Sequence, residues 1–301
     1  MSTISDLFSK SVRTVREEGW ASLARKARAN LQTARAAARA KPIGGTYMYL
    51  EPRVNRVVSP NDQIYRSLER DKASENYFTG GLDNLGRIDQ IFRRHTGRTL
   101  GDARSVADYA CHYGRLLRCL RAAFSDVPLY ACGIDQEAVD FCTKQFGARP
   151  LLTPWAVETI AVEPEQDLVC CLSLLTHTRR EFFPRVLELW NRMLRPGGVL
   201  LFTFLGEDYP AQWLAGKMHA YGQADRPTIE RTIREFSQHE HAFYAQTARY
   251  GGVNDYGIGF LRTSLVREEI EGHPGLQLLE ILPGRSNGFM QDVAVARKVS
   301  A

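Results

Sequence analysis

The 301-residue sequence has no run of about 18 uncharged apolar residues, the length that a membrane-spanning helix needs. It has no Cys-x-x-Cys pair and no cysteine–histidine spacing that suits zinc, so we expect no metal site. It also has no Gly-x-Gly-x-x-Gly turn, which disfavours an enzyme that uses a nicotinamide dinucleotide. Its start has no apolar signal core and no cleavage site, and we therefore expect a cytoplasmic protein.

Cysteines are few, and they fall mostly inside apolar segments. Free cysteine in such a setting behaves as a small buried apolar residue. We therefore expect reduced core thiols at all six positions, namely Cys111, Cys119, Cys132, Cys142, Cys170 and Cys171.

Positive charge gathers at the start of the chain. The net charge is only +5, but residues 1–41 hold nine lysines and arginines against three acids. Their apolar residues recur at helical spacing, which predicts a basic amphipathic helical extension. Such a helix can lie on an anionic membrane surface, here the inner face of the membrane, or bind a partner protein; it can equally pack on its own domain. No basic patch with interleaved aromatics occurs elsewhere, so we expect no nucleic-acid partner.

Residues 42–98 precede the first predicted strand. Pro42, Gly44 and Gly45 indicate a linker, and residues 60–98 have helical periodicity. We expect two helices there, split at Gly80 and Gly81. The segment is either part of a substrate lid or simply packs on the following domain.

Residues 99–301 alternate between strands and helices, which predicts a mostly parallel sheet with helices on both faces. In such a sheet ligands bind at the carboxyl ends of the strands. An insertion at 206–252 interrupts the alternation, and 254–261 and 289–299 are expected to form a closing antiparallel pair around a helix at 263–273. The other expected strands are 104–109, 128–134, 149–153, 166–172 and 198–205, and the other helices are 114–125, 136–146 and 179–195.

The turn after the first strand reads VADYACHYGR, residues 106–115. Asp108 ends the strand, Ala110 is small, and Gly114 opens the next helix. A turn of this kind points backbone N–H groups at a ligand. The alternative is an ordinary strand–helix turn that binds nothing. We take Asp108, Ala110, His112, Gly114 and Arg115 as candidate cofactor-binding residues.

Polar residues also follow the second and fourth strands. Asp135, beside Gln136, could accept hydrogen bonds from a ribose, or could only cap the helix that begins there. Ser173 and Leu174 stand at the carboxyl end of the strand at 166–172. His177 could be a general base, or could hydrogen-bond the backbone and order its loop.

Taken together, these stretches resemble the class I S-adenosylmethionine-dependent methyltransferases, over residues 77–299. The details resemble a branch found beside bacterial glycosyltransferases. The segments that carry this likeness are DYACHYGR at 108–115, AVDFC at 138–142, LLTH at 174–177, LRPGGVLLFTF at 194–204, YGI at 256–258 and QDV at 291–293.

The resemblance implies a Rossmann-like sheet of seven strands, the last antiparallel, with S-adenosylmethionine over residues 108–115. It implies that the ribose meets an acid after the second strand, for which Asp135 is the candidate, that the adenine lies near Trp155 and its neighbours, and that Ser173, Leu174 and Leu175 flank the methionine part.

The function implied is methylation of a hydroxyl on a glycan or a small metabolite. His177 is the first candidate for a base. The alternative function is a catalytically silent scaffold in a glycan-assembly complex. Other candidate bases are Asp292, His239, His241, Asp255 and Tyr256.

Overall fold

The computed structural model describes residues 47–70, 72–216, 224–246, 256–284 and 289–299. The expected basic helix at 1–41 and the candidate base Asp255 lie outside these ranges. Within them, no helix combines the length and the apolar character that crossing a membrane requires.

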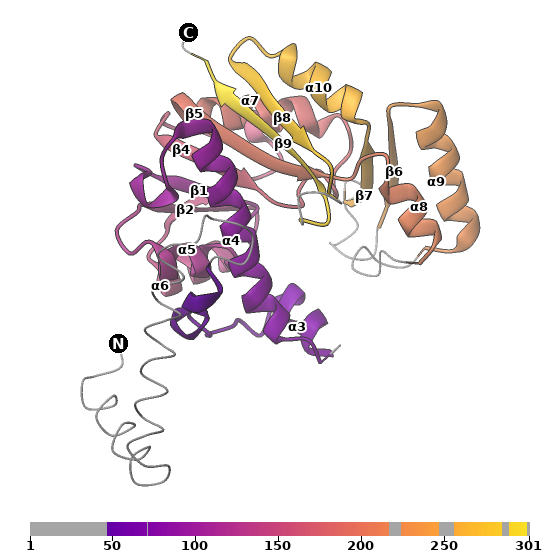
Figure 1. Cartoon of the computed structure of the whole chain (residues 1–301). Coiled ribbons are helices and arrows are strands. Elements are labelled where there is room, and N and C mark those ends of the chain that lie inside the picture. The colour runs from indigo at the N-terminus through magenta and orange to yellow at the C-terminus, as the bar shows by residue number, and fades with distance from the viewer. Residues whose placement is uncertain (1–46, 71, 217–223, 247–255, 285–288, 300–301) are drawn as a thin grey trace, which may run out of the picture.

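One sheet of seven strands organises the molecule (Figure 1). Its first five strands in spatial order are parallel, and β9 runs antiparallel to both of its neighbours. This confirms the expected Rossmann-like architecture. In spatial order the strands are β3 (Arg149–Leu152), β2 (Leu129–Gly133), β1 (Val106–Tyr109), β4 (Gln166–Cys171), β5 (Leu194–Phe204), β9 (Asp292–Lys298) and β8 (Leu276–Leu282).

Helices cover both faces of the sheet, as expected. Helices α4 (Glu75–Thr96), α5 (Leu117–Ala123) and α6 (Gln136–Phe146) pack on one face with Val106. Helices α7 (Phe182–Met193) and α10 (Thr263–Glu271) pack on the other with Ala107 and Tyr109. Because side chains alternate along a strand, Asp108 points to the α4–α6 face. Short 3₁₀ helices complete the layers: η1 (Met48–Arg53), η2 (Leu100–Asp102) and η3 (Val157–Thr159).

The insertion after β5 forms a small unit at one end of the sheet (Figure 1). It contains α8 (Tyr209–Leu214), α9 (Arg226–Gln238), β6 (His241–Ala245) and β7 (Gly257–Leu261). Strands β6 and β7 pair with each other in a separate sheet. The expected closing pair is therefore wrong: 254–261 supplies β7 of the small sheet, and the partner of β9 at the edge is β8.

Within the described residues, two α-helices precede the sheet, α3 (Gln63–Arg70) and α4. The expected split at Gly80 and Gly81 is wrong, because α4 passes through both residues. A β-carbon at Gly81 would lie 2.8 Å from the Arg115 carbonyl oxygen and 2.8 Å from Cys119 Sγ. These glycines therefore allow α4 to approach α5 closely. In the sequence alone, glycines that permit close helix packing look the same as glycines that end a helix.

All six cysteines lie in the described part of the chain. Each is buried, and none forms a disulfide bond. The expectation of reduced core thiols is confirmed.

Candidate functional site

The loop between β1 and α5 has the backbone of a glycine-rich turn without most of the glycines. The φ angles of Ala110, His112 and Gly114 are +64°, +46° and +74°. A left-handed conformation costs a non-glycine residue roughly 1–2 kcal/mol. Helix α5 begins at Leu117, three residues later than expected, because residues 114–116 belong to the turn. Strain of this kind persists only where the surrounding structure holds it, and it is common at binding sites.

The carbonyl groups of this loop are hydrogen-bonded on the side of α5 and α6. The oxygen of His112 accepts from the thiols of Cys111 and Cys142, at 3.5 and 3.3 Å. The oxygen of Tyr113 accepts from Arg118 Nη2 at 3.1 Å. In a trans peptide the N–H that follows a carbonyl points the opposite way. The Tyr113 N–H, which follows the His112 carbonyl, therefore faces away from these helices, whereas the Gly114 N–H donates to the Cys111 carbonyl oxygen at 2.9 Å within the turn.

Asp108 is a buried acid at the carboxyl end of β1. Its exposed fraction is 4%. Burial raises the pKa of its carboxyl group to about 8, and no hydrogen bond or charge from another group in the described structure lowers it. A buried carboxylate is stable only when paired or hydrogen-bonded. Asp108 therefore indicates a place where a cationic or hydrogen-bonding ligand would be stabilised.

Asp135 lies just after β2 and caps α6. Its Oδ1 accepts from the backbone N–H groups of Glu137 and Ala138, at 2.9 and 3.4 Å. The capping role is therefore confirmed, while a contact with a ribose stays a prediction. Gln136 is exposed beside it, and its Nε2 donates to Asp140 Oδ1 at 2.8 Å.

Ser173 lies at the carboxyl end of β4, in a left-handed conformation with φ of +66°. Its N–H donates to Thr203 Oγ1 at 2.7 Å, and its hydroxyl oxygen accepts from Gln291 Nε2 at 2.8 Å. Leu174 follows, half-buried, and its carbonyl oxygen accepts from the His177 N–H at 2.9 Å. The loop after β4 is thus fixed by hydrogen bonds to β5 and to the start of β9.

Trp155 lies in the loop after β3, half-buried against the first turn of α7. Its ring meets that of Phe182 edge to face, with 5.0 Å between centroids. Its carbonyl oxygen accepts from Arg185 Nη2 at 3.0 Å. The aromatic ring is thereby held at the strand-end edge, where the resemblance implies an adenine.

Arg115 reaches toward α4. Its Nε donates to the Tyr77 carbonyl at 3.0 Å, and its Nη2 donates to the Asn76 carbonyl at 2.8 Å. Burial lowers its pKa. The guanidinium occupies the space where a β-carbon at Gly80 would lie. The side chain of Arg115 therefore fastens the loop to α4, and a contact with the cofactor stays a prediction.

His177 joins the loop after β4 to the small sheet. Its Nδ1 lies 2.8 Å from the Gly257 carbonyl oxygen, and its ring stacks on Tyr256 with 4.7 Å between centroids and 9° between planes. A carbonyl oxygen can only accept, so Nδ1 carries the proton and Nε2 is the basic nitrogen of the neutral ring. The expected backbone hydrogen bond is confirmed. The role as a base stays a prediction.

The other candidate bases in the described part of the chain are Tyr256, on which the His177 ring stacks, and Asp292, His241 and His239. Asp292 accepts from the Gly284 N–H at 2.6 Å, and burial raises its pKa. His241 pairs with Leu261, at the opposite end of β7 from the residue that His177 contacts. His239 is exposed at the end of α9.

The roles of two residues of this region do not follow from the sequence patterns. Gln291 belongs to the QDV segment of the resemblance, but its contact with Ser173 spans 118 residues of sequence, so no local pattern reveals that contact. Arg118 lies on the buried side of α5, beside Leu117 and Cys119. A lone arginine on an apolar helix face is the one signal that could have identified it.

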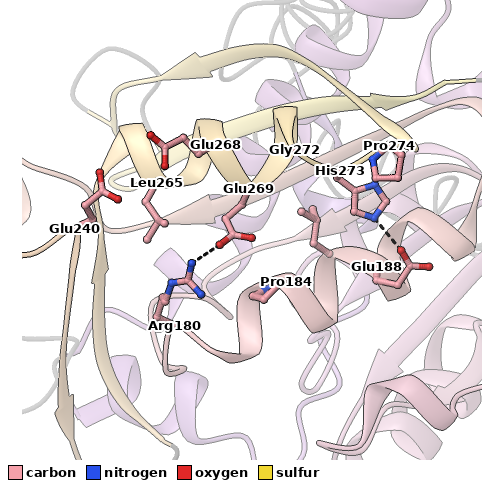
Figure 2. A pocket seen from close by; sticks show the side chains of 11 residues that line it. Arg180, Pro184, Glu188, Glu240, Leu265, Glu268, Glu269, Gly272, His273 and Pro274 are labelled. Atoms are coloured by element: carbon pink, nitrogen blue, oxygen red, sulfur yellow. Dashed lines mark hydrogen bonds and ion pairs between the residues drawn. The ribbon is translucent and has the colours of Figure 1, made fainter.

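A groove of about 540 Å³ lies elsewhere, between α7 and α10 (Figure 2). Two pairs of its side chains interact: Arg180 Nη2 lies 2.5 Å from Glu269 Oε1, and His273 Nε2 lies 2.8 Å from Glu188 Oε2. The loop between β1 and α5 does not line it. The groove is therefore separate from the strand-end site.

Several solved structures are similar to this chain at a distance. One is DesVI of Streptomyces venezuelae, 13% identical over 81% of this chain and 100% of that one, with a TM-score of 0.49. Another is CalS10 of Micromonospora echinaspora, an amino pentose methyltransferase solved with S-adenosylmethionine. It is 12% identical over 81% of this chain and 100% of that one, with a TM-score of 0.49. A third is a Burkholderia thailandensis 1,6-didemethyltoxoflavin-N1-methyltransferase. It is 14% identical over 82% of this chain and 94% of that one, with a TM-score of 0.46.

No curated protein matches the chain in sequence. Residues 107–202 do match a protein family described as "Methyltransferase domain". This stretch runs from β1 to β5 and includes the loop with Asp108, the cap of α6 and the loop after β4. The chain therefore carries a methyltransferase domain of the kind that uses S-adenosylmethionine.

Proposed function

We propose that this protein methylates a hydroxyl group of a glycan or a small metabolite, with His177 as the base. When bound, S-adenosylmethionine supplies a methyl group on a positively charged sulfur, which needs no further activation. The protein then has to hold the two reactants in line, exclude water and accept the hydroxyl proton. The observation that carries the proposal is the buried, unpaired acid Asp108 beside a turn with glycine-like geometry.

The residues at the strand ends fit this cofactor. The ammonium of its methionine part would give Asp108 the positive partner that the described protein does not supply. The Tyr113 N–H, which faces away from α5 and α6, suits its carboxylate. Asp135 uses one oxygen for its cap, and its Oδ2 accepts no hydrogen bond within the described structure, which leaves an acceptor for ribose hydroxyls. Trp155 offers an aromatic face to the adenine.

Hydroxyl methylation is supported by the state of His177. Its Nδ1–H is engaged by the Gly257 carbonyl, so the neutral ring has its basic nitrogen at Nε2. Stacking on Tyr256 fixes the plane of the ring. A base held in one tautomer and one orientation can accept a proton without reorganisation, which contributes about 10²–10⁴-fold to such reactions.

The aromatic residues of the insertion do not add to this argument. Trp213, Phe236 and Phe260 are buried against one another and form its core. The proposed acceptor class rests on the base alone, and a charged acceptor would be expected to need an additional partner.

Two measurements test the function. Calorimetric titration with S-adenosylhomocysteine should show micromolar binding; no binding at millimolar levels would favour a catalytically silent scaffold.

His177→Ala should lower kcat roughly 100-fold while leaving the cofactor Kd within about twofold. His241→Ala, at the other end of the small sheet, is the matched control and should leave kcat unchanged. Unchanged turnover in His177→Ala would remove His177 from the mechanism.

A further inference from the structure

Arg118 is a buried cation whose donors all reach backbone carbonyls. Its exposed fraction is 1%. Its Nε donates to Gly114 at 3.2 Å and its Nη2 donates to Tyr113 at 3.1 Å, both in the loop after β1. Its Nη1 donates to Asn55 at 2.8 Å and to Val57 at 3.1 Å. One guanidinium thus joins two segments that are about 60 residues apart in sequence.

No carboxylate in the described structure forms an ion pair with this guanidinium. Aromatic rings surround it instead, with its central carbon 5.0 Å from the Tyr77 centroid, 5.1 Å from that of Phe146 and 5.6 Å from that of Phe78. Cation–π attraction and carbonyl dipoles therefore offset the desolvation of the charge. Such a costly arrangement serves helix packing poorly, since a leucine would fill an apolar face without that desolvation.

The second segment is the strap, which we define as residues 54–62, between η1 and α3. It passes beside α5 and α6, in the indigo part of Figure 1. Asn61 Nδ2 donates to Glu137 Oε1 at 2.7 Å, in the first turn of α6 and two residues from Asp135. Asn55 Nδ2 donates to the Gln145 carbonyl at 3.3 Å, near the other end of that helix. The strap therefore contacts the elements that carry both predicted cofactor loops.

We propose that Arg118 is a positioning residue for the cofactor, which couples the docking of the strap to the shape of the loop after β1. Ala110 and His112 are held in left-handed conformations, and this strain needs external support. Arg118 supplies part of that support by fixing the next two carbonyls. Because the same guanidinium also holds the strap, undocking the strap relaxes the loop, and cofactor binding orders the strap. The cofactor part of this inference rests on the proposed function.

The chain offers a matched control on the same helix. Arg121 also donates to backbone carbonyls, through Nε to Phe146 at 2.8 Å and through Nη1 to Val127 at 3.2 Å, but it contacts neither the strap nor the loop after β1. We expect Arg118→Met to weaken S-adenosylhomocysteine binding about tenfold or more, Arg118→Lys to weaken it less, and Arg121→Met to change it less than twofold. Equal losses in Arg118→Met and Arg121→Met would overturn the proposal.

Hydrogen exchange without cofactor separates this inference from the proposed function. In Arg118→Met, or in Arg118→Lys if the first variant does not fold, amides of 54–62 and of 110–114 should exchange faster together, while Arg121→Met should leave both unchanged. Faster exchange in only one of the two segments, or in neither, would exclude the coupling. Failure of the wild type to bind S-adenosylhomocysteine would count against the proposed function, and the exchange result would still decide whether Arg118 couples the segments.

Discussion

Two consecutive residues of β1, equally buried, differ in how their polar groups are satisfied. Asp108 is 4% exposed and faces α4–α6, and Tyr109 is 3% exposed and faces α7. The Tyr109 ring meets Trp190 edge to face at 5.5 Å, and its hydroxyl is hydrogen-bonded to Thr153. Asp108 has no such partner in the described structure. Equal burial therefore leaves the two residues in different states, because of the two only Asp108 lacks a partner in the described structure.

The contrast extends to the two faces of the sheet. On the α7 side the core is aromatic, with Phe202 between Phe183 and Trp190 at centroid distances of 5.5 and 5.4 Å. On the α4–α6 side an acid and an arginine, Asp108 and Arg118, are buried beside the strained loop. We infer that Asp108 supplies the charged contact with the cofactor, whereas the aromatic core around Phe202 contributes packing. The predictions below test this division.

Asp108→Asn should have the largest effect. The amide keeps the shape of the side chain but loses the charge that would pair with the ammonium of the cofactor. A hydrogen bond between charged groups contributes about 1.5–3 kcal/mol, so S-adenosylhomocysteine should bind roughly 10- to 100-fold more weakly in calorimetry. Tyr109→Phe is the control on the other face and should bind within twofold of the wild type. Equal affinities in Asp108→Asn and the wild type would end the assignment.

The same acid predicts a proton release on binding. Burial raises the pKa of Asp108 to about 8, so the carboxyl group is mostly protonated at pH 7 without cofactor. A nearby ammonium favours the charged form and lowers that pKa. Calorimetry at pH 7 in buffers of different ionisation enthalpy should therefore show close to one proton released per S-adenosylhomocysteine, and none in Asp108→Asn. Equal release in both proteins would place the titrating group elsewhere.

Stability should depend on pH through Asp108 as well. Folding raises its pKa from 3.8 to about 8, so the folded protein retains a proton that the unfolded chain loses between these pH values. The stability from this group is complete below about pH 4 and is lost as the pH rises to 8. In urea denaturation without cofactor, the free energy of unfolding of the wild type should fall between pH 6 and pH 8 relative to that of Asp108→Asn. If the difference in free energy of unfolding between the two proteins did not change with pH, Asp108 would not titrate in this range.

The strand–helix core follows from the sequence because its strands are apolar runs with turn residues at their ends. The seventh strand does not: most of Leu276–Leu282 is half-buried, and its pairing with β9 contains a register shift, so its pattern is blurred. Gly80 and Gly81 resemble a helix break because a single sequence does not show which neighbour needs the space.

The candidate site also contains residues that the sequence predicts and residues that it does not. Asp108, Ser173 and His177 follow from the strand ends, where the fold itself places polar residues. The roles of the side chains of Arg115 and Arg118 depend on carbonyls of residues 38 to 63 positions away, which no local pattern encodes.

Phe202→Leu tests the opposite face. The ring is fully buried among aromatic neighbours, and shortening it leaves a small cavity. The free energy of unfolding should fall by roughly 1–2 kcal/mol. The cofactor Kd should stay within twofold, because the ring contacts of Phe202 are with Phe183, Trp190 and Phe204. A loss of affinity as large as that of Asp108→Asn would show that this aromatic core also shapes the cofactor site.

His112→Gly should have the smallest effect and examines the loop most finely. Glycine adopts the φ of +46° without the steric cost that histidine incurs, but the unfolded chain then gains conformational freedom. These effects nearly cancel, so stability should change by less than about 1 kcal/mol. The carbonyl of residue 112 can still accept from Cys142, so the cofactor Kd should stay within about threefold. A tenfold loss would mean that the imidazole itself contacts the cofactor, and a tenfold gain would mean that it competes for the same space.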